Sequence, residues 1–122
     1  MIKHLTDFPD NVVAFCCSGR LTKTDYDRVL VPAVLDKLRT HDKVRLYYEI
    51  GEDFSGFDPG AMWEDFKVGV EHLTRWEKIA VVTDIAWIRN AVQCFAFLMP
   101  ATTKLYSRAE ATQARAWILL DR

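Results

Sequence analysis

The residues with the clearest capacity for chemistry lie in one acidic stretch of the sequence. Six carboxylates fall between positions 49 and 65, namely Glu49, Glu52, Asp53, Asp58, Glu64 and Asp65. Such a group could hold a hard cation or supply an acid and a base, but a calcium loop needs a regular aspartate series and a distal glutamate, which are absent. We therefore expect Asp58 to cap a helix and the other carboxylates to form a solvated face, with no metal bound.

Three glycines, Gly51, Gly56 and Gly60, punctuate the same stretch. A glycine-rich loop can cradle phosphate groups, but this spacing matches neither a dinucleotide fingerprint nor a Walker loop. The negative charge around the glycines also disfavours a nucleotide. We expect these residues to allow the backbone angles of a tight turn, with no cofactor bound.

Cysteines and histidines are the other residues with catalytic or ligand potential: Cys16, Cys17, Cys94, His4, His41 and His72. Neighbouring side chains of a strand point to opposite faces, so a disulfide between Cys16 and Cys17 would strain the backbone. The spacing places no base beside a thiol, and the histidines fall on separate predicted elements. We expect buried or half-buried free thiols, no metal site and no catalytic residue.

Composition and charge limit the classes of protein to which the chain can belong. It has 122 residues, 50% of them hydrophobic and 27% charged, which is typical of one globular domain over residues 1–122. The formal net charge of -1 lacks the positive excess that attracts nucleic acid. The charged N-terminal segment, and the lack of any stretch of about 20 apolar residues, predict a cytoplasmic protein.

The hydrophobic pattern predicts alternating strands and helices, which must position these residues. Strands are expected at 2–5, 12–18, 44–50, 79–82 and 103–106. In the strand at 44–50, Val44, Leu46, Tyr48 and Ile50 are expected inward and Arg45, Tyr47 and Glu49 outward, or the reverse. The order β-β-α-β-α-β-α-β-α predicts an α/β fold with a mostly parallel sheet and an antiparallel N-terminal edge hairpin.

Local signals set the four expected helices. Thr22 or Thr24 caps the first helix, and Pro32 should kink or divide it. Asp58 and Pro59 open the second, whose apolar stripe is Met62, Phe66, Val70 and Leu73. Asp84 caps the third, at about 85–98, which Pro100 ends. Ser107 and Glu110 form a capping box for the last, with Ala111, Ala114, Trp117 and Ile118 facing inward.

The third helix has more apolar residues than one packed face needs. Its inward stripe is expected to hold Ile88, Ala91, Val92, Phe95 and Met99. Outside that stripe lie Trp87, Cys94, Phe97 and Leu98, and the second helix and its loop add Trp63, Phe54 and Phe57. This surplus could pack as a wide stripe between sheet and helices, form a dimer or partner interface, or contact an apolar ligand or a membrane.

Four long segments carry a family resemblance: FPDNVVAFCCSGRLTKTDYDRVLVPAV, KVRLYYEIGEDFSGFDPGAMWEDFKVG, KIAVVTDIAWIRNAV and FLMPATTKLY. With them the chain resembles the SpoIIAA-like proteins of the STAS superfamily over nearly its whole length. The resemblance implies the small mixed sheet with helices of bacterial anti-sigma factor antagonists and of anion-transporter cytoplasmic domains. It also implies a family without an established enzymatic activity, and a shape similar to that of lipid-carrying CRAL-TRIO domains.

The resemblance also draws attention to Ser55. In STAS antagonists a loop carries Asp-x-Ser-Gly at a helix N-terminus, where a partner kinase phosphorylates the serine, and the run from Asp53 to Gly56 matches this pattern. Here Phe57 and Asp58 delay the helix, so Ser55 is not expected at a helix N-terminus, where the dipole favours phosphate. Ser55 is therefore either a phosphorylation site or a turn serine bonded to its own backbone.

Together these features predict a non-enzymatic binding protein. Its ligand is an apolar small molecule or a membrane surface, held in a cleft between the second and third helices. The expected contacts are Phe54, Phe57, Trp63, Trp87, Cys94, Phe97 and Leu98. Membrane contact would place the protein on the inner face of the membrane. The alternative is a regulatory module of the anti-sigma factor antagonist type, switched at Ser55, with a protein partner or a second copy bound.

Overall fold

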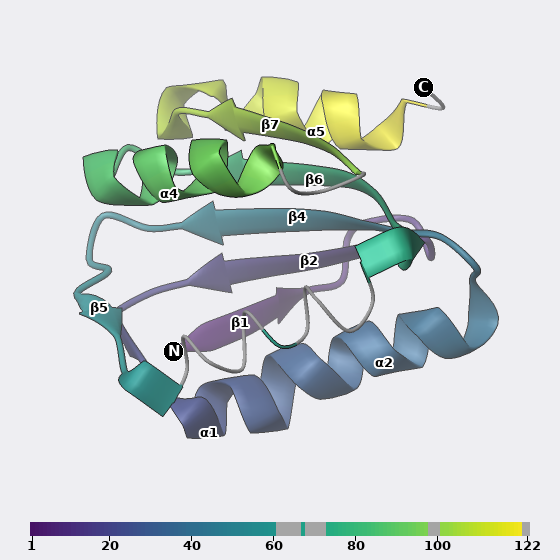
Figure 1. The fold of residues 1–122 in the computed structure, drawn as a ribbon, viewed down its shortest axis with the longest axis horizontal. Helices are drawn as coiled ribbons and strands as arrows, with labels where there is room; N and C mark the ends of the chain where they lie inside the picture. The colour runs from purple at the N-terminus through teal and green to yellow at the C-terminus, as the bar shows by residue number, and fades with distance from the viewer. Residues whose placement is uncertain (61–66, 68–72, 98–100, 121–122) are drawn as a thin grey trace.

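A five-stranded mixed sheet forms the centre of the computed structural model, which describes residues 1–60, 67, 73–97 and 101–120 (Figure 1). The strands are β1 (Ile2–Leu5), β2 (Val12–Cys17), β4 (Val44–Ile50), β6 (Trp76–Val82) and β7 (Thr102–Tyr106), in that spatial order. β1 runs antiparallel to β2, and the other neighbours are parallel. The predicted α/β class, strand positions and edge hairpin are thus confirmed.

A second, two-stranded sheet was not predicted. It pairs β3 (Arg20–Leu21) with β5 (Gly56–Phe57) in parallel, just beyond the carboxyl ends of β2 and β4 (Figure 1). Gly19, with φ of 62°, turns the chain from β2 into β3, and Gly56 has φ of 139°. Both values lie in a region that side chains beyond glycine rarely adopt, which accounts for glycine at the two turns.

The first helical region is divided into three parts. α1 (Lys23–Asp25) is followed by a π-helical segment, Tyr26–Leu30, and by α2 (Val31–Thr40). The Thr22 hydroxyl accepts from the Asp25 N–H and the Asp25 carboxylate accepts from the Thr22 N–H, which completes a capping box. The predicted interruption takes the form of a wide turn directly before Pro32, in which the Val31 N–H donates to the Tyr26 carbonyl.

The helices cover both faces of the sheet. On one face α2 and α4 (Ala86–Ala96) contribute Val34, Leu38 and Ile88 to the larger apolar core, with residues of β2, β4 and β6. On the other face α5 (Ala111–Leu119) contributes Ala114 and Ile118 to a smaller core. Ala111 and Trp117 pack partly buried against that smaller core, so the predicted inward face of the last helix is confirmed.

Coverage on both faces corrects the outward positions expected in the strand at 44–50. The alternation itself holds, but α5 covers the second face, so that Tyr47 is fully buried and Arg45 is only 5% exposed. The Arg45 guanidinium is accommodated because it donates to the carbonyls of Ile118 (2.8 Å) and Leu120 (2.5 Å). Buried cations need such partners, and here they hold the end of α5 on the sheet.

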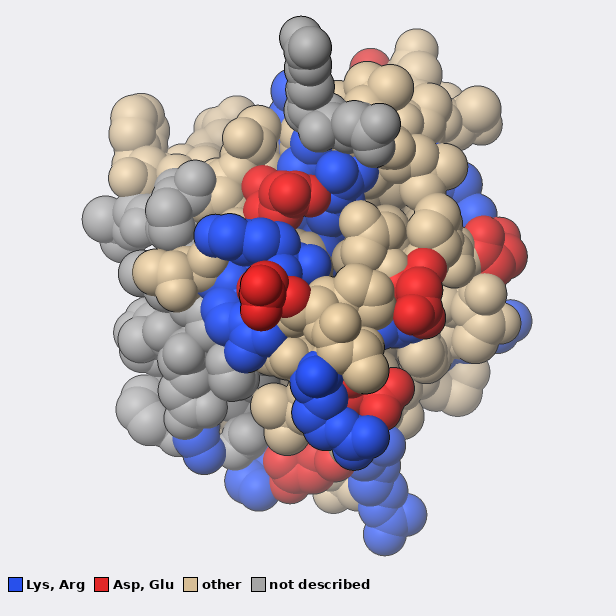
Figure 2. Space-filling model, turned by 90° about the vertical axis from the view of Figure 1, so that its right-hand side faces the viewer, with Lys and Arg blue, Asp and Glu red and all other residues tan. Residues whose placement is uncertain are grey.

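Charges at the amino ends of the parallel strands serve similar structural roles. Arg75 donates to the carbonyls of Leu38 and His41, both at 2.6 Å, and Lys43 donates to that of Thr74 at 2.5 Å. Figure 2 shows this side of the molecule, with basic and acidic side chains interleaved over it. The visible face therefore has no extended patch of one sign.

Helix boundaries after Asp58 and before α5 agree with the sequence signals. Pro59 and Gly60 are helical directly after Asp58, and the Ser107–Glu110 capping box is present before α5. The predicted cap at Asp84 differs from the bonds observed. The Asp84 carboxylate accepts from the Arg108 N–H (3.1 Å), in the segment before α5, and it is the Thr83 hydroxyl that accepts from the Ile85 N–H (3.1 Å) directly before α4. Outside the described residues lie these predicted positions: Met62, Trp63, Glu64, Asp65, Phe66, Val70, His72, Leu98, Met99 and Pro100.

Candidate functional site

Three aromatic side chains meet at the carboxyl end of the parallel strands. Phe54 lies just before β5, Phe57 is the second residue of β5, and Trp87 lies in the first turn of α4. The ring centroids of Phe54 and Phe57 are 4.9 Å apart, and Trp87 lies 6.4 Å from the first and 6.1 Å from the second. These spacings are typical of edge-to-face packing, and we name Phe54, Phe57 and Trp87 the aromatic cluster.

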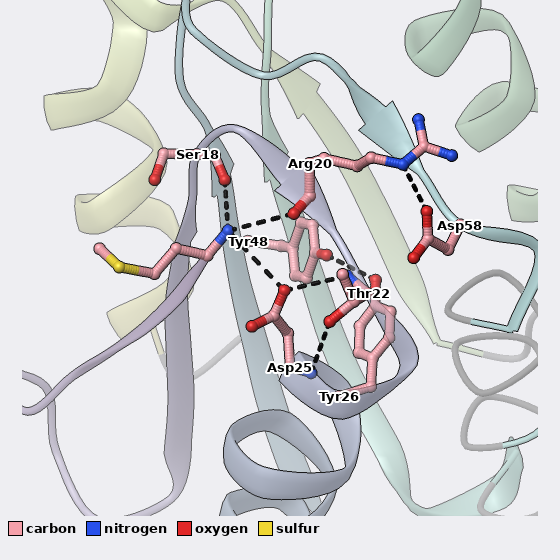
Figure 3. A network of polar contacts seen from close by, with 8 residues as sticks. Ser18, Arg20, Thr22, Asp25, Tyr26, Tyr48 and Asp58 are labelled. Atoms are coloured by element: carbon pink, nitrogen blue, oxygen red, sulfur yellow. Dashed lines mark hydrogen bonds and ion pairs between the residues drawn. The ribbon is translucent and has the colours of Figure 1, made fainter.

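Two tyrosines form the buried side of this cluster. The Tyr26 ring lies nearly parallel to that of Phe57, with 7° between the planes and 6.5 Å between the centroids. The hydroxyls of Tyr26 and Tyr48 lie 2.8 Å apart in the core, as Figure 3 shows. The aromatic cluster is thus continuous with the main core on one side.

On its other side the cluster reaches solvent along α4. Trp87 is 51% exposed and Phe97, directly after the helix, is 93% exposed. Ile88 is buried and Val92 packs against the core as predicted, whereas Ala91 is exposed. Arg89, half-buried, donates to the Thr83 carbonyl at 2.8 Å. The exposed positions of α4 that the structure describes therefore carry no charged side chain.

The structure brings some of the predicted site residues together and leaves others outside the described part of the chain. The structure brings Phe54, Phe57 and Trp87 together, and it places Cys94 on the exposed side of α4, two turns after Trp87. Phe97 follows at the end of that helix. Trp63 and Leu98, and most of the predicted second helix, lie outside the described residues. The expected cleft between the two helices therefore remains a prediction.

None of the three cysteines, all of which the structure describes, forms a disulfide, but their burial differs from the expectation in one case. Cys17 is buried and Cys16 half-buried, as predicted, whereas Cys94 is exposed. The reason is that Cys94 falls on the outer side of α4, which no described element covers.

Ser55 lies in the segment that carries the two phenylalanines. Its side chain is exposed, and its N–H donates to the Gly19 carbonyl at 2.9 Å. β5 stands between Ser55 and the helix that begins at Pro59, so the serine is not at a helix N-terminus, as predicted. Of the neighbouring carboxylates, Glu52 pairs with Arg108 at 2.8 Å.

A polar group on the α5 face was missed from the sequence. The Tyr47 hydroxyl donates to Glu49 at 2.6 Å, and the Cys16 thiol lies 4.0 Å from the other oxygen of that carboxylate. Burial and the nearby Glu49 raise the pKa of the Cys16 thiol, so the thiol stays neutral at pH 7 and is a poor nucleophile. Burial and the bond to Glu49 likewise raise the pKa of Tyr47. The alternation within β4 predicts that Tyr47 and Glu49 share a face. It does not show that Cys16 lies next to them, because that contact depends on the pairing of β2 with β4.

The described part of the chain has neither a metal-binding group nor a membrane-spanning helix. Within it, no group of three or more histidine, cysteine, aspartate or glutamate residues is arranged to hold a metal ion. No helix among the same residues has both the length and the apolar character needed to cross a bilayer.

Comparison with known proteins identifies the family. A model of the SpoIIAA-like family matches residues 12–119, while a search of curated proteins gives no match. In structure the chain is similar to an uncharacterized protein of the DUF3478 family from Shewanella loihica PV-4, which has a SpoIIAA-like fold. The TM-score is 0.75 at 21% identity, over 97% of this chain and 92% of that chain. Since the family model spans most of the sequence, the chain belongs to the SpoIIAA-like family of the STAS superfamily.

Proposed function

We propose that this protein is a non-enzymatic binding protein, and that the aromatic cluster and the outer side of α4 contact an apolar small molecule or a membrane surface. One observation carries the proposal: aromatic rings from two distant segments meet beside a helix whose described exposed positions are uncharged. A surface helix normally keeps its outer side polar, and an uncovered apolar surface is typical of a binding site.

Two modes of contact use this surface differently. The half-exposed Trp87, packed against Phe54 and Phe57, suits a small apolar molecule, because such ligands are bound mainly by aromatic and aliphatic side chains. The almost fully exposed Phe97 suits insertion into the boundary of a bilayer. With a net charge of -1, insertion would depend on apolar contact and not on attraction to anionic lipid.

Two substitutions test the proposal and separate the modes. Trp87→Ser should weaken binding of dansyl-labelled undecanoic acid roughly tenfold or more, because the indole ring that the ligand would contact is lost. Phe97→Ser should instead reduce co-sedimentation with phosphatidylcholine vesicles. Leu35→Ser is the matched control, since Leu35 is 46% exposed but lies on α2. If the wild-type protein binds neither probe, or if the control loses as much binding as the two variants, the proposal fails.

The exposed position of Ser55 favours a second candidate, a regulatory module that binds a protein partner. A phosphate there would add charge beside Glu52 and Asp53, both of them exposed, and would change the surface that a partner meets. Ser55→Asp should then alter affinity in a pull-down with a partner, whereas Ser55→Ala should resemble the wild type. Equal affinity of both variants would count against this candidate.

A further inference from the structure

The segment that carries Phe54 and Phe57 is attached to the rest of the molecule by few bonds. We name residues 52–58 the strap. The Ser55 N–H donates to the Gly19 carbonyl at 2.9 Å, and the Asp58 N–H donates to that of Leu21 at 2.8 Å. β5 within the strap is only two residues long. Short segments with few hydrogen bonds are those that open locally while the core stays folded.

The support on which the strap lies is held more firmly. Leu21 of β3 is fully buried, and Thr22 directly after it caps α1. The Gly51 N–H donates to the Cys17 carbonyl at 2.9 Å, which fixes the chain where the strap begins. The Met1 amino group also donates to the Ser18 carbonyl, at 2.5 Å. Opening would therefore move the strap away from β3 and leave β3 in place.

One ion pair joins the strap to this support, and a second, Glu52–Arg108 at 2.8 Å, joins the first residue of the strap to the segment before α5. The Arg20 guanidinium, from β3, donates through Nε to the carboxylate of Asp58 at the end of the strap (Figure 3). The two side chains are 57% and 34% exposed, so dissolved salt can screen their attraction. The pair therefore links β3 to the residue that follows β5 and directly precedes the next helix.

We propose that the strap is a lid over the site formed by the aromatic cluster, and that the Arg20–Asp58 pair is its latch. Opening withdraws Phe54 and Phe57 from Trp87 and Tyr26, so that an apolar molecule enters between the strap and α4. Because the latch is a solvent-exposed ion pair, ionic strength sets how often the lid opens. This inference rests on the proposed binding function and adds its regulation.

Amide hydrogen exchange measures how often the strap opens, and it requires no ligand. Arg20→Met should speed exchange at the Ser55 and Asp58 amides roughly two- to fivefold, as expected for an exposed ion pair, and leave β4 amides unchanged. Arg39→Met is the matched control, because Arg39 forms an exposed pair with Asp36 on α2, away from the strap. Unchanged exchange in Arg20→Met, or an equal change throughout the chain, would overturn the latch.

A salt series on the wild-type protein tests the same idea without a substitution. Between about 0.01 M and about 1 M salt the Debye length falls from about 30 Å to about 3 Å, so exchange at the two strap amides should quicken. Arg20→Met should show a weaker dependence, because only the Glu52–Arg108 pair of the strap then remains to be screened. Equal salt dependence in the two proteins would contradict the latch.

Association kinetics test whether opening of the lid controls the rate of ligand binding. Dansyl-labelled undecanoic acid should associate two- to fivefold faster with Arg20→Met than with the wild type or with Arg39→Met, in stopped-flow fluorescence. A wild-type protein that binds no probe would overturn the proposed function. A protein that binds the probe at a rate indifferent to Arg20→Met would overturn the lid alone.

Discussion

At the scale of single residues, the three cysteines differ in the exposure and the surroundings of their thiols. Cys94 is exposed on α4, Cys16 is half-buried beside Glu49, and Cys17 is buried in the core. The pKa of Cys16 is raised by burial first and by the Glu49 charge second, which lowers the fraction of reactive thiolate. Exposure and thiolate fraction together set the rate of alkylation.

We therefore expect iodoacetamide to modify Cys94 first, at least tenfold faster than Cys16 or Cys17 at neutral pH. Peptide mass spectrometry over a time course would measure the three rates. Glu49→Gln should speed the reaction of Cys16 and leave Cys94 unchanged, because it removes a charge that opposes the thiolate. Cys16 reacting as fast as Cys94 in the wild type would contradict this account.

At the scale of elements, the start of α5 depends on its capping box. The Ser107 N–H donates to the Glu110 carboxylate at 2.8 Å, and the Ser107 hydroxyl accepts from the Glu110 backbone. The first of these bonds is the main cause that lowers the pKa of Glu110 below its ordinary value. The stabilisation is therefore present above the ordinary pKa and is lost as pH falls through the lowered pKa.

Glu110→Ala should accordingly lower the urea midpoint at neutral pH, and the difference from the wild type should shrink as the solution is acidified past the lowered pKa. Urea titrations followed by circular dichroism at several pH values would measure this difference. Thr112→Ala is the control, since Thr112 is exposed in the same helix and lies outside the box. A difference that stays constant from neutral to acid pH would rule out the titration of Glu110 as its source.

At the element scale, the predicted strand bounds and helix caps are confirmed where neighbouring residues alone set them. The strands at 2–5 and 44–50 have the predicted bounds, and the caps at Thr22 and Ser107 form as expected. The small β3–β5 sheet was missed because each strand has only two residues, too few to show an alternation. Of the glycines expected to allow turn angles, Gly56 has a positive φ, whereas Gly51 and Gly60 do not. The positive φ of Gly19 was not predicted.

At the scale of the whole molecule, the family and the α/β class followed from the sequence, while most of the candidate site did not. Helical spacing alone assigned Ala91 to the inward stripe, yet it is exposed. It also could not show that Phe54 and Phe57 reach Trp87, about thirty positions later in the chain. Part of the predicted set, Trp63 and Leu98, lies outside the described residues and stays a prediction.

The sequence by itself determined the five strands of the main sheet and their order along the chain with the helices, because period, caps and turn residues act over a few neighbouring positions. Only the tertiary structure decided which side chains become neighbours. It buried Arg45 and Tyr47 by laying α5 on the second face of β4, and it placed Cys16 beside Glu49 through parallel pairing of β2 with β4. Such contacts depend on strand order and on the packing of distant segments, which local patterns do not specify.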